Sequence, residues 1–233
     1  MNLATFQLQL DQRIAPYDLL CHPFYKAWSA GELTRADLRD YAAEYFHQID
    51  GFPACLEAFA ARLEDGPARR AVLSNLADEQ GRDSEHGGGV PHPELWLDFA
   101  EGMGADREAV RRSTPSAAIT DLTAHFEAAS AAGAPEAALA AFYAFESQVP
   151  RVAREKARGL RAWYGATDTT CRYFTLHGTA DVHHANVWKQ LVSRRVAANP
   201  QLAEPALAAA EDTARALWTA LDGIQARRLA RAA

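Results

Sequence analysis

Residues 173–188 combine two histidines and an aspartate at a spacing that could bind a metal ion. If this segment is helical, His177, Asp181 and His184 stand at positions i, i+4 and i+7 and share one face. His183 points away from that face. Apolar residues continue the face, so we expect it to be buried in the core. Burying two imidazoles and a carboxylate costs free energy unless a partner interacts with them. A divalent iron, manganese or zinc ion would compensate them; the alternative is a polar face with a hydrogen-bonded core histidine.

Two glutamates continue the apolar stripes of other expected helices. Glu79 follows Val72 and Leu76 in a helix expected over residues 67–80, and Glu146 shares a stripe with Leu139 and Phe142 in one expected over residues 136–164. Pro150 cannot donate to the carbonyl of residue 146, so the second helix should be perturbed beside Glu146. Together with the triplet, these glutamates make five potential ligands, about the number that two bridged metals need, and they predict a dinuclear site.

A Glu-x-x-His pair, Glu44 and His47, lies on the long helix that begins after Thr34. Such a pair can ligate metal in a ferritin-like bundle. That motif should occur on two helices, however, and the sequence has no second copy. A surface carboxylate and a polar lining residue are therefore the favoured interpretation.

The composition predicts an all-α protein. The 233-residue chain is rich in Ala, poor in Gly and Pro, and has no alternating strand-like runs. No linker divides residues 1–233, which predicts a single domain.

The net charge of −6 and the absence of a basic block argue against a nucleic-acid or membrane partner. Cys21, Cys55 and Cys171 are far apart, which suits a reducing compartment. Without a signal-peptide pattern or a membrane-spanning run, we expect a cytoplasmic protein.

Longer motifs resemble one enzyme family. They are HPFYKAWSAGEL, EYFHQIDGFP, NLADE, HPELWLDFAEGMG, FYAFESQVPRVAREKARGL and YFTLHGTADVHHA, within residues 20–190. The chain resembles the haem-oxygenase-like di-metal oxidases, in the folate-associated branch named for the chlamydial protein associating with death domains, which is related to TenA-like and PqqC-like proteins. The resemblance implies a haem-oxygenase-like bundle of about seven or eight helices. It also implies two divalent metals, Fe/Fe or Fe/Mn, used with O2 and an external reductant.

The resemblance also implies a ligand set of six residues. Carried over motif by motif, it comprises Glu79, His92, Glu146, His177, Asp181 and His184. Periodicity alone selects five of these, and only His92 depends on the resemblance. His86 would keep the family's seven-residue spacing from Glu79, whereas His92 keeps the HPELW context. We prefer His92, because Gly and Pro break the helix in either case.

An unusual reaction is implied as well. Members of this branch make 4-aminobenzoate from one of their own tyrosines, with a lysine as amino donor, and the matching positions are Tyr25 and Lys156. A phenol ring is already para-substituted, and a desolvated amine could attack it once oxidised. Phe145 stands where the resemblance suggests a redox-active tyrosine, so Tyr143 and Tyr173 are the nearby candidates. Without the resemblance, Tyr25 would be a core aromatic and Lys156 a surface charge.

Three alternatives to this reaction stay open. The first is a metal oxidase acting on an external small molecule, and the second is a metal-free enzyme like the TenA-like and PqqC-like relatives. The third is a helical interaction protein, although no stretch of the sequence marks a partner groove. A homodimer is a further expectation.

Overall fold

The computed structural model describes residues 2–82 and 89–232, and these residues fold into helices with no strand. The α-helices are α1 (Leu3–Ile14), α2 (Pro23–Ala30), α3 (Arg35–Arg62), α4 (Pro67–Glu79), α5 (His92–Gly102), α6 (Arg107–Arg111), α7 (Ala117–Ala131), α8 (Pro135–Glu146), α9 (Val149–Trp163), α10 (Asp168–Ala198) and α11 (Ala203–Ala232). The all-α prediction is confirmed. The described residues hold more helices than the seven or eight expected, partly because α6 is a single short turn and an expected helix is divided in two.

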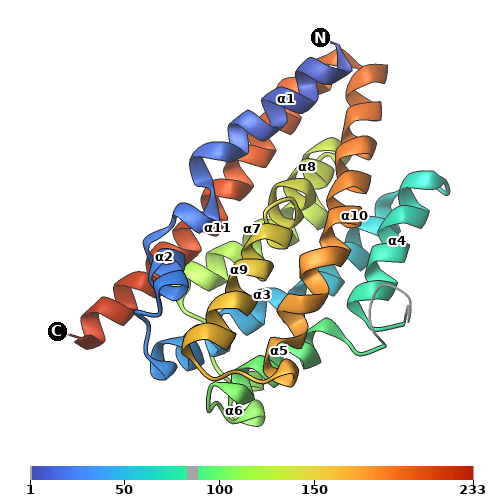
Figure 1. Ribbon diagram of the computed structural model, residues 1–233. Helices are drawn as coiled ribbons and strands as arrows, with labels where there is room; N and C mark the ends of the chain where they lie inside the picture. Colours follow the sequence, from blue (N-terminus) through green and yellow to red (C-terminus); the bar gives the residue numbers. More distant parts are fainter. Residues whose placement is uncertain (1, 83–88, 233) are drawn as a thin grey trace.

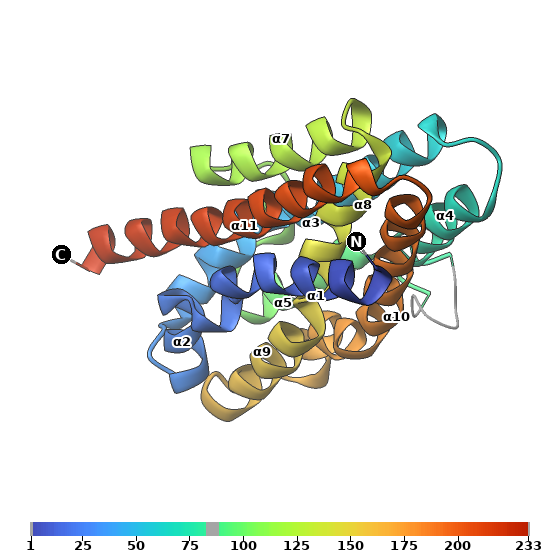
Figure 2. The ribbon, with the colours of Figure 1, turned by 90° about the horizontal axis from the view of Figure 1, so that it is seen from above.

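The long helices α3, α10 and α11 frame the bundle (Figure 1). Helix α10 packs against α5, α8 and α9, while α3 packs against α4, α5 and α7. Helix α11 covers α1, α7 and α8 and lies on the side of the molecule away from α9 (Figure 2). The helices expected to carry ligands, α4, α5, α8 and α10, are thus brought together around one interior. No helix in the described part of the chain is long and apolar enough to cross a membrane.

Helix α3 supplies one wall of this interior. It begins at a capping box in which the Thr34 side chain accepts from the Asp37 backbone and the Asp37 carboxylate accepts from the Thr34 backbone. Its buried stripe includes Tyr41, Tyr45 and Ile49 at helical spacing. The cap fixes where the helix starts, and the apolar stripe fixes which face turns inward.

A break between α8 and α9 replaces the single helix expected over residues 136–164. Helix α8 ends at Glu146 and α9 begins at Val149, with Pro150 in its first turn. Because Pro150 has no N–H, the carbonyl of Glu146 loses its helical partner at the position where the sequence predicts a perturbation. The Gln148 side chain in the break accepts from the backbone N–H of Leu19 at 3.0 Å. The break leaves Glu146 at the end of a helix, facing α4 and α10.

Candidate metal centre and the tyrosine–lysine cluster

The structure buries the three polar residues of α10 that share a helical face. His177, Asp181 and His184 are 3 %, 2 % and 3 % exposed, whereas His183 lies on the exposed side. The phase of the helix therefore separates the adjacent histidines as their spacing predicts. The Nδ1 atom of His177 donates to the carbonyl of Tyr173 at 2.7 Å, which leaves Nε2 unprotonated and directed at the interior when the imidazole is neutral.

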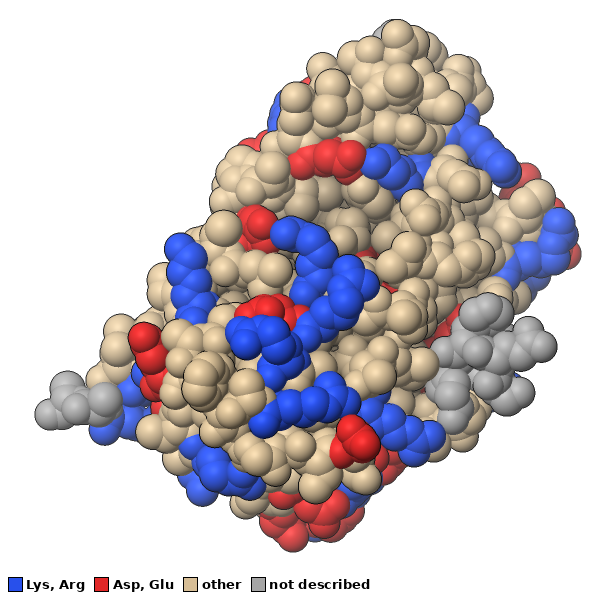
Figure 3. All heavy atoms as spheres, in the orientation of Figure 1, with Lys and Arg blue, Asp and Glu red and all other residues tan. Residues whose placement is uncertain are grey.

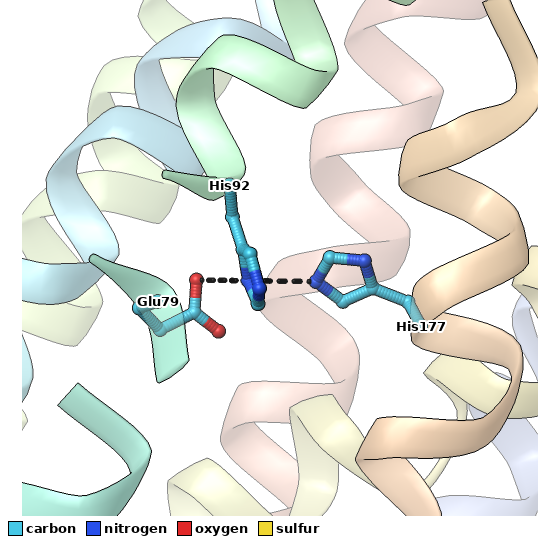
Figure 4. Close-up of side chains that lie close together, drawn as sticks. All are labelled: Glu79, His92 and His177. Carbon is cyan, nitrogen blue, oxygen red and sulfur yellow. Dashed lines mark hydrogen bonds and ion pairs between the residues drawn. The ribbon is translucent and has the colours of Figure 1, made fainter. Parts of the chain in front are cut away.

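Three residues from three helices meet at one point, as Figure 4 shows. His92 Nδ1 lies 2.7 Å from a carboxylate oxygen of Glu79 and 3.1 Å from His177 Nε2, and the three potential ligand atoms lie within 4.8 Å of one another. His92 is fully buried, and its Nε2 has no hydrogen-bond partner among the residues that the structure describes. His86, the alternative to His92, lies outside the described residues. Two imidazole nitrogens and one carboxylate oxygen in this arrangement form a set that suits a divalent transition metal.

The other three expected ligands lie beside this group. His184 Nδ1 is 3.4 Å from a carboxylate oxygen of Asp181. Glu146 is buried and lines a cavity of about 10 Å³ together with Glu79, His177 and Asp181. All six residues taken from the sequence are therefore brought to one region of the core.

Sequence reasoning missed the side chains that hold these groups in place. Asp78 accepts from His184 Nε2 at 2.8 Å, so that Nδ1 of the same ring is the atom left for a metal. Glu146 accepts from the indole of Trp188 at 2.5 Å and from the amide of Asn75 at 3.3 Å. Trp188 lies on the same α10 stripe as the histidines, but its polar role carries no sequence signal. Asp78 was passed over because it is offset from the apolar stripe of α4.

The electrostatics of the cluster call for a positive ion. Burial opposes the charged forms of both Glu79 and His92, yet their contact lowers the pKa of Glu79 and raises the pKa of His92. Burial likewise opposes charge on His184, but hydrogen bonds to Asp181 and Asp78 raise its pKa to about 11. Burial raises the pKa of Glu146. The raised pKa values of His92, His184 and Glu146 favour bound protons beside the buried carboxylates, and divalent ions could replace those protons.

Glu44 and His47 lie apart from this centre. Glu44 accepts from the Ser116 backbone at 3.0 Å and pairs with Arg227 of α11, while His47 contacts the Ser113 hydroxyl at 2.9 Å. Both side chains tie α3 to neighbouring segments, which agrees with the structural interpretation favoured from the sequence.

A second buried cluster joins Tyr25 of α2, Tyr41 of α3 and Lys156 of α9. Lys156 Nζ donates to Tyr25 Oη at 2.8 Å and to Tyr41 Oη at 2.6 Å, and it lies 4.2 Å from the centroid of the Tyr25 ring. Lys156 is 6 % exposed and forms no ion pair within the described part of the chain. Burial therefore lowers the pKa of Lys156 well below its usual value and raises the pKa of Tyr25. Tyr41 belongs to the buried stripe of α3, and its spacing carries no signal of this polar contact.

Tyr173 connects the two clusters. Its ring stacks on His177 with centroids 3.9 Å apart and lines both the cavity beside Glu146 and a cavity of about 30 Å³ beside Tyr25 and Lys156. Phe145 lines both cavities as well. Tyr143 faces elsewhere, because its hydroxyl donates to the Asp11 carboxylate at 2.5 Å. Of the two tyrosines that could replace the phenol missing at Phe145, only Tyr173 borders both cavities.

Comparisons with known proteins identify the family of this chain. The family model described as "Iron-containing redox enzyme" matches residues 39–218. The chain is 37% identical to the 4-aminobenzoate synthase of Chlamydia trachomatis over 94% of its own length and 91% of the relative's. It is 37% identical to the 4-aminobenzoate synthase of Nitrosomonas europaea, over 96% and 92% of the two chains.

A solved structure shows the same fold. A domain of unknown function with a heme oxygenase-like fold, from Shewanella denitrificans, superposes with a TM-score of 0.77 at 20% identity, over 98% of this chain and 94% of that one. The resemblance drawn from the motifs is confirmed. The chain belongs to the iron-containing redox enzyme family and is an oxidoreductase with a haem-oxygenase-like fold.

Proposed function

We propose that this enzyme is an oxygen-dependent dinuclear metal oxidase that forms 4-aminobenzoate from its own Tyr25, with Lys156 as the amino donor. The observation that carries the proposal is the buried amine of Lys156, 2.8 Å from the Tyr25 hydroxyl and one side chain away from the carboxylate–histidine cluster. The relatives named 4-aminobenzoate synthase support the identity of the product.

Two ions, Fe/Fe or Fe/Mn, fit the six buried side chains of the candidate metal centre. The unpartnered Nε2 of His92 and the buried carboxylates support this assignment. Glu79, His92 and His177 would hold one ion, while Glu146, Asp181 and His184 would hold the other. When bound, the metals would supply oxidation by O2, and an external reductant would restore them.

The protein's own residues then have defined roles. Because burial lowers the pKa of Lys156, it favours the neutral amine, whose nitrogen has a lone pair available for attack on the ring once the ring is oxidised. The ring and Cβ of Tyr25 supply the benzoate carbons, and Nζ of Lys156 supplies the amino group. A C–N bond forms at the ring carbon that bears the hydroxyl, whose oxygen leaves as water. The Cα–Cβ bond of Tyr25 breaks as one O2 takes Cβ to the carboxylate, and a hydrogen replaces Cβ on Cα, so that a glycine is left at position 25. The Cε–Nζ bond of Lys156 breaks as a second O2, with two electrons from the external reductant, oxidises Cε to an aldehyde, and the other oxygen atom leaves as water.

We assign to Tyr173 the transfer of an oxidising equivalent from the metal centre to the Tyr25 cluster. Its ring contacts His177 on one side and borders the cavity of Tyr25 on the other. Burial raises the pKa of Tyr173, so that it stays a neutral phenol and can lose a hydrogen atom as a unit. Phe145 at the same wall has no hydroxyl for this role.

The size of the inner cavity argues against an external aromatic substrate. Its volume is only about 30 Å³. An aromatic molecule would have to displace side chains already packed there. Tyr25 is an aromatic ring that already occupies the position, so the internal substrate is favoured.

Intact-protein mass spectrometry tests the proposal. Wild-type protein loaded with iron or with iron and manganese should lose mass at Tyr25 and Lys156 after exposure to reductant and O2, releasing at most one 4-aminobenzoate per chain. Tyr25→Phe should bind the metals and release none. Tyr17→Phe, a change outside both cavities, should behave as wild type. Product release by the Tyr25→Phe protein would refute the self-consuming reaction.

A further inference from the structure

Helix α9 presents a row of arginines to solvent on the side opposite Lys156. Arg151, Arg154, Arg158 and Arg161 are exposed at positions i, i+3, i+7 and i+10, and Arg172 of α10 is exposed close by in sequence. Figure 3 shows Lys and Arg gathered over α9 and the adjoining part of α10. We call these five residues the arginine face.

The arginine face is positive on a protein that is negative overall. The ion-pair partners of its four α9 arginines within the described residues are three carboxylates, those of Asp18, Glu155 and Asp168. Four arginines of α9 therefore face three acids, while the whole chain carries a net charge of −6. This contrast would orient an acidic partner, attracting it to α9 and repelling it from the rest of the surface.

A hollow lies beside the arginine face, over the ligand helices α5 and α10. It has a volume of about 590 Å³, and its lining includes Arg172, Leu176 of α10 and Leu95 of α5. Leu176 is the neighbour of His177, and Leu95 follows His92 by one helical turn. The hollow is thus separated from the expected ligands by no more than a helix, about 10–12 Å across with its side chains.

A direct contact also links the arginine face to the ligand helix. The Arg154 guanidinium donates to the carbonyl of Gly178 at 2.6 Å, one residue after His177. Glycine suits this approach, because a Cβ at position 178 would lie 3.1 Å from Arg154 Cγ. A partner on this face would touch the segment that positions His177.

We propose that a small acidic one-electron carrier protein docks on the arginine face and over the hollow, and that it is the external reductant. This inference rests on the proposed function, which requires electrons from outside the chain. Each reduced carrier would give up one electron toward the metal centre and leave oxidised, so two dockings would supply an electron pair. Electrostatic steering suits such a short-lived encounter.

Binding to the metal-free full chain tests the surface without depending on catalysis. The probe is a labelled acidic [2Fe–2S] ferredoxin, followed by fluorescence anisotropy at low ionic strength. We expect binding by wild type that weakens with added salt, and at least tenfold weaker binding by Arg158→Glu/Arg161→Glu. The matched control, Arg194→Glu/Arg215→Glu, changes the same charge at exposed positions outside the arginine face and should bind as wild type. Arg158→Gln/Arg161→Gln should give an intermediate loss if the charge reversal unfolds the chain.

Absence of wild-type binding at low salt, or an equal loss in the control, would overturn the docking surface. Metal-loaded protein gives a second measurement, the rate of its reduction by ferredoxin or by dithionite. In the arginine-face variants, reduction by ferredoxin should be slower than in wild type, and reduction by dithionite should have the same rate. Reduction through this face without any 4-aminobenzoate would refute the proposed function and keep the docking surface. Product formation with dithionite, without any binding of ferredoxin, would refute the docking surface and keep the proposed function.

Discussion

Replacing Lys156 by Met should change the stability of the metal-free protein in a pH-dependent way. Above the ordinary lysine pKa of about 10.4, the amine is neutral in both the folded and unfolded states. Wild type should then be more stable by the two hydrogen bonds from Lys156 to Tyr25 and Tyr41, at 2.8 and 2.6 Å. At about 0.5–1.5 kcal/mol each, these bonds contribute about 1–3 kcal/mol.

The advantage of wild type should decrease as the pH falls. Burial lowers the pKa of folded Lys156, so below pH 10.4 the unfolded chain binds a proton that the folded chain does not. The free energy of unfolding therefore decreases as pH falls, by up to about 1.4 kcal/mol per unit, until the folded-state pKa is reached. Wild type should therefore lose up to about 2.8 kcal/mol of its advantage over Lys156→Met between pH 10.4 and pH 8.4.

Urea unfolding followed by circular dichroism from pH 7 to 10.5 measures this difference. Lys26→Met, a change at an exposed lysine, provides the control and should differ from wild type by a constant amount. A stability difference between wild type and Lys156→Met that does not change over this range would refute the neutral buried amine. The nucleophilic role proposed for Lys156 would then lose its physical basis.

Three further predictions concern the two clusters. Lys156→Arg should bind metal normally but release no 4-aminobenzoate, because a guanidinium stays charged and is a poor nucleophile; product detected by liquid chromatography would contradict this. His177→Ala should lose iron in elemental analysis while His183→Ala keeps it, since only His177 faces the interior. Asp78→Asn should weaken metal binding about 10–100-fold in a competition titration, because Asp78 orients His184 at 2.8 Å; unchanged affinity would show that this contact is incidental.

Helical periodicity predicted the residues that face the interior. The i, i+4, i+7 spacing separated His184 from His183, and the stripe of α8 placed Glu146 inside. These predictions succeed because the direction of a side chain on a helix follows from its position in the sequence. His92 was found only through the resemblance, because a loop precedes it and the phase of a helix does not continue through a loop.

Hydrogen-bond partners across helices could not be predicted in this way. Tyr41 was part of an apolar stripe, and nothing in its spacing revealed that its hydroxyl contacts Tyr25 and Lys156 from two other helices. Asp78 lies beside Glu79 in sequence but reaches a different histidine. Such pairings depend on how α2, α3, α4, α9 and α10 pack, and packing is decided by the whole core. The extra helix boundary at Glu146 was only partly foreseen, because Pro150 predicted a perturbation but not a complete break.

The residue types in the Tyr25 cluster indicate a role in a reaction rather than in stability. Met at position 156 and Phe at positions 25 and 41 would fill the same core without desolvating one amine and two phenol oxygens. The chain instead places a lysine there with phenol oxygens as its hydrogen-bond partners, 2.8 and 2.6 Å away. Hydrogen bonds to neutral phenols stabilise the amine without providing the negative charge that would keep it protonated. An arrangement that opposes stability and yet holds an amine unprotonated against an aromatic ring is expected where that amine must react.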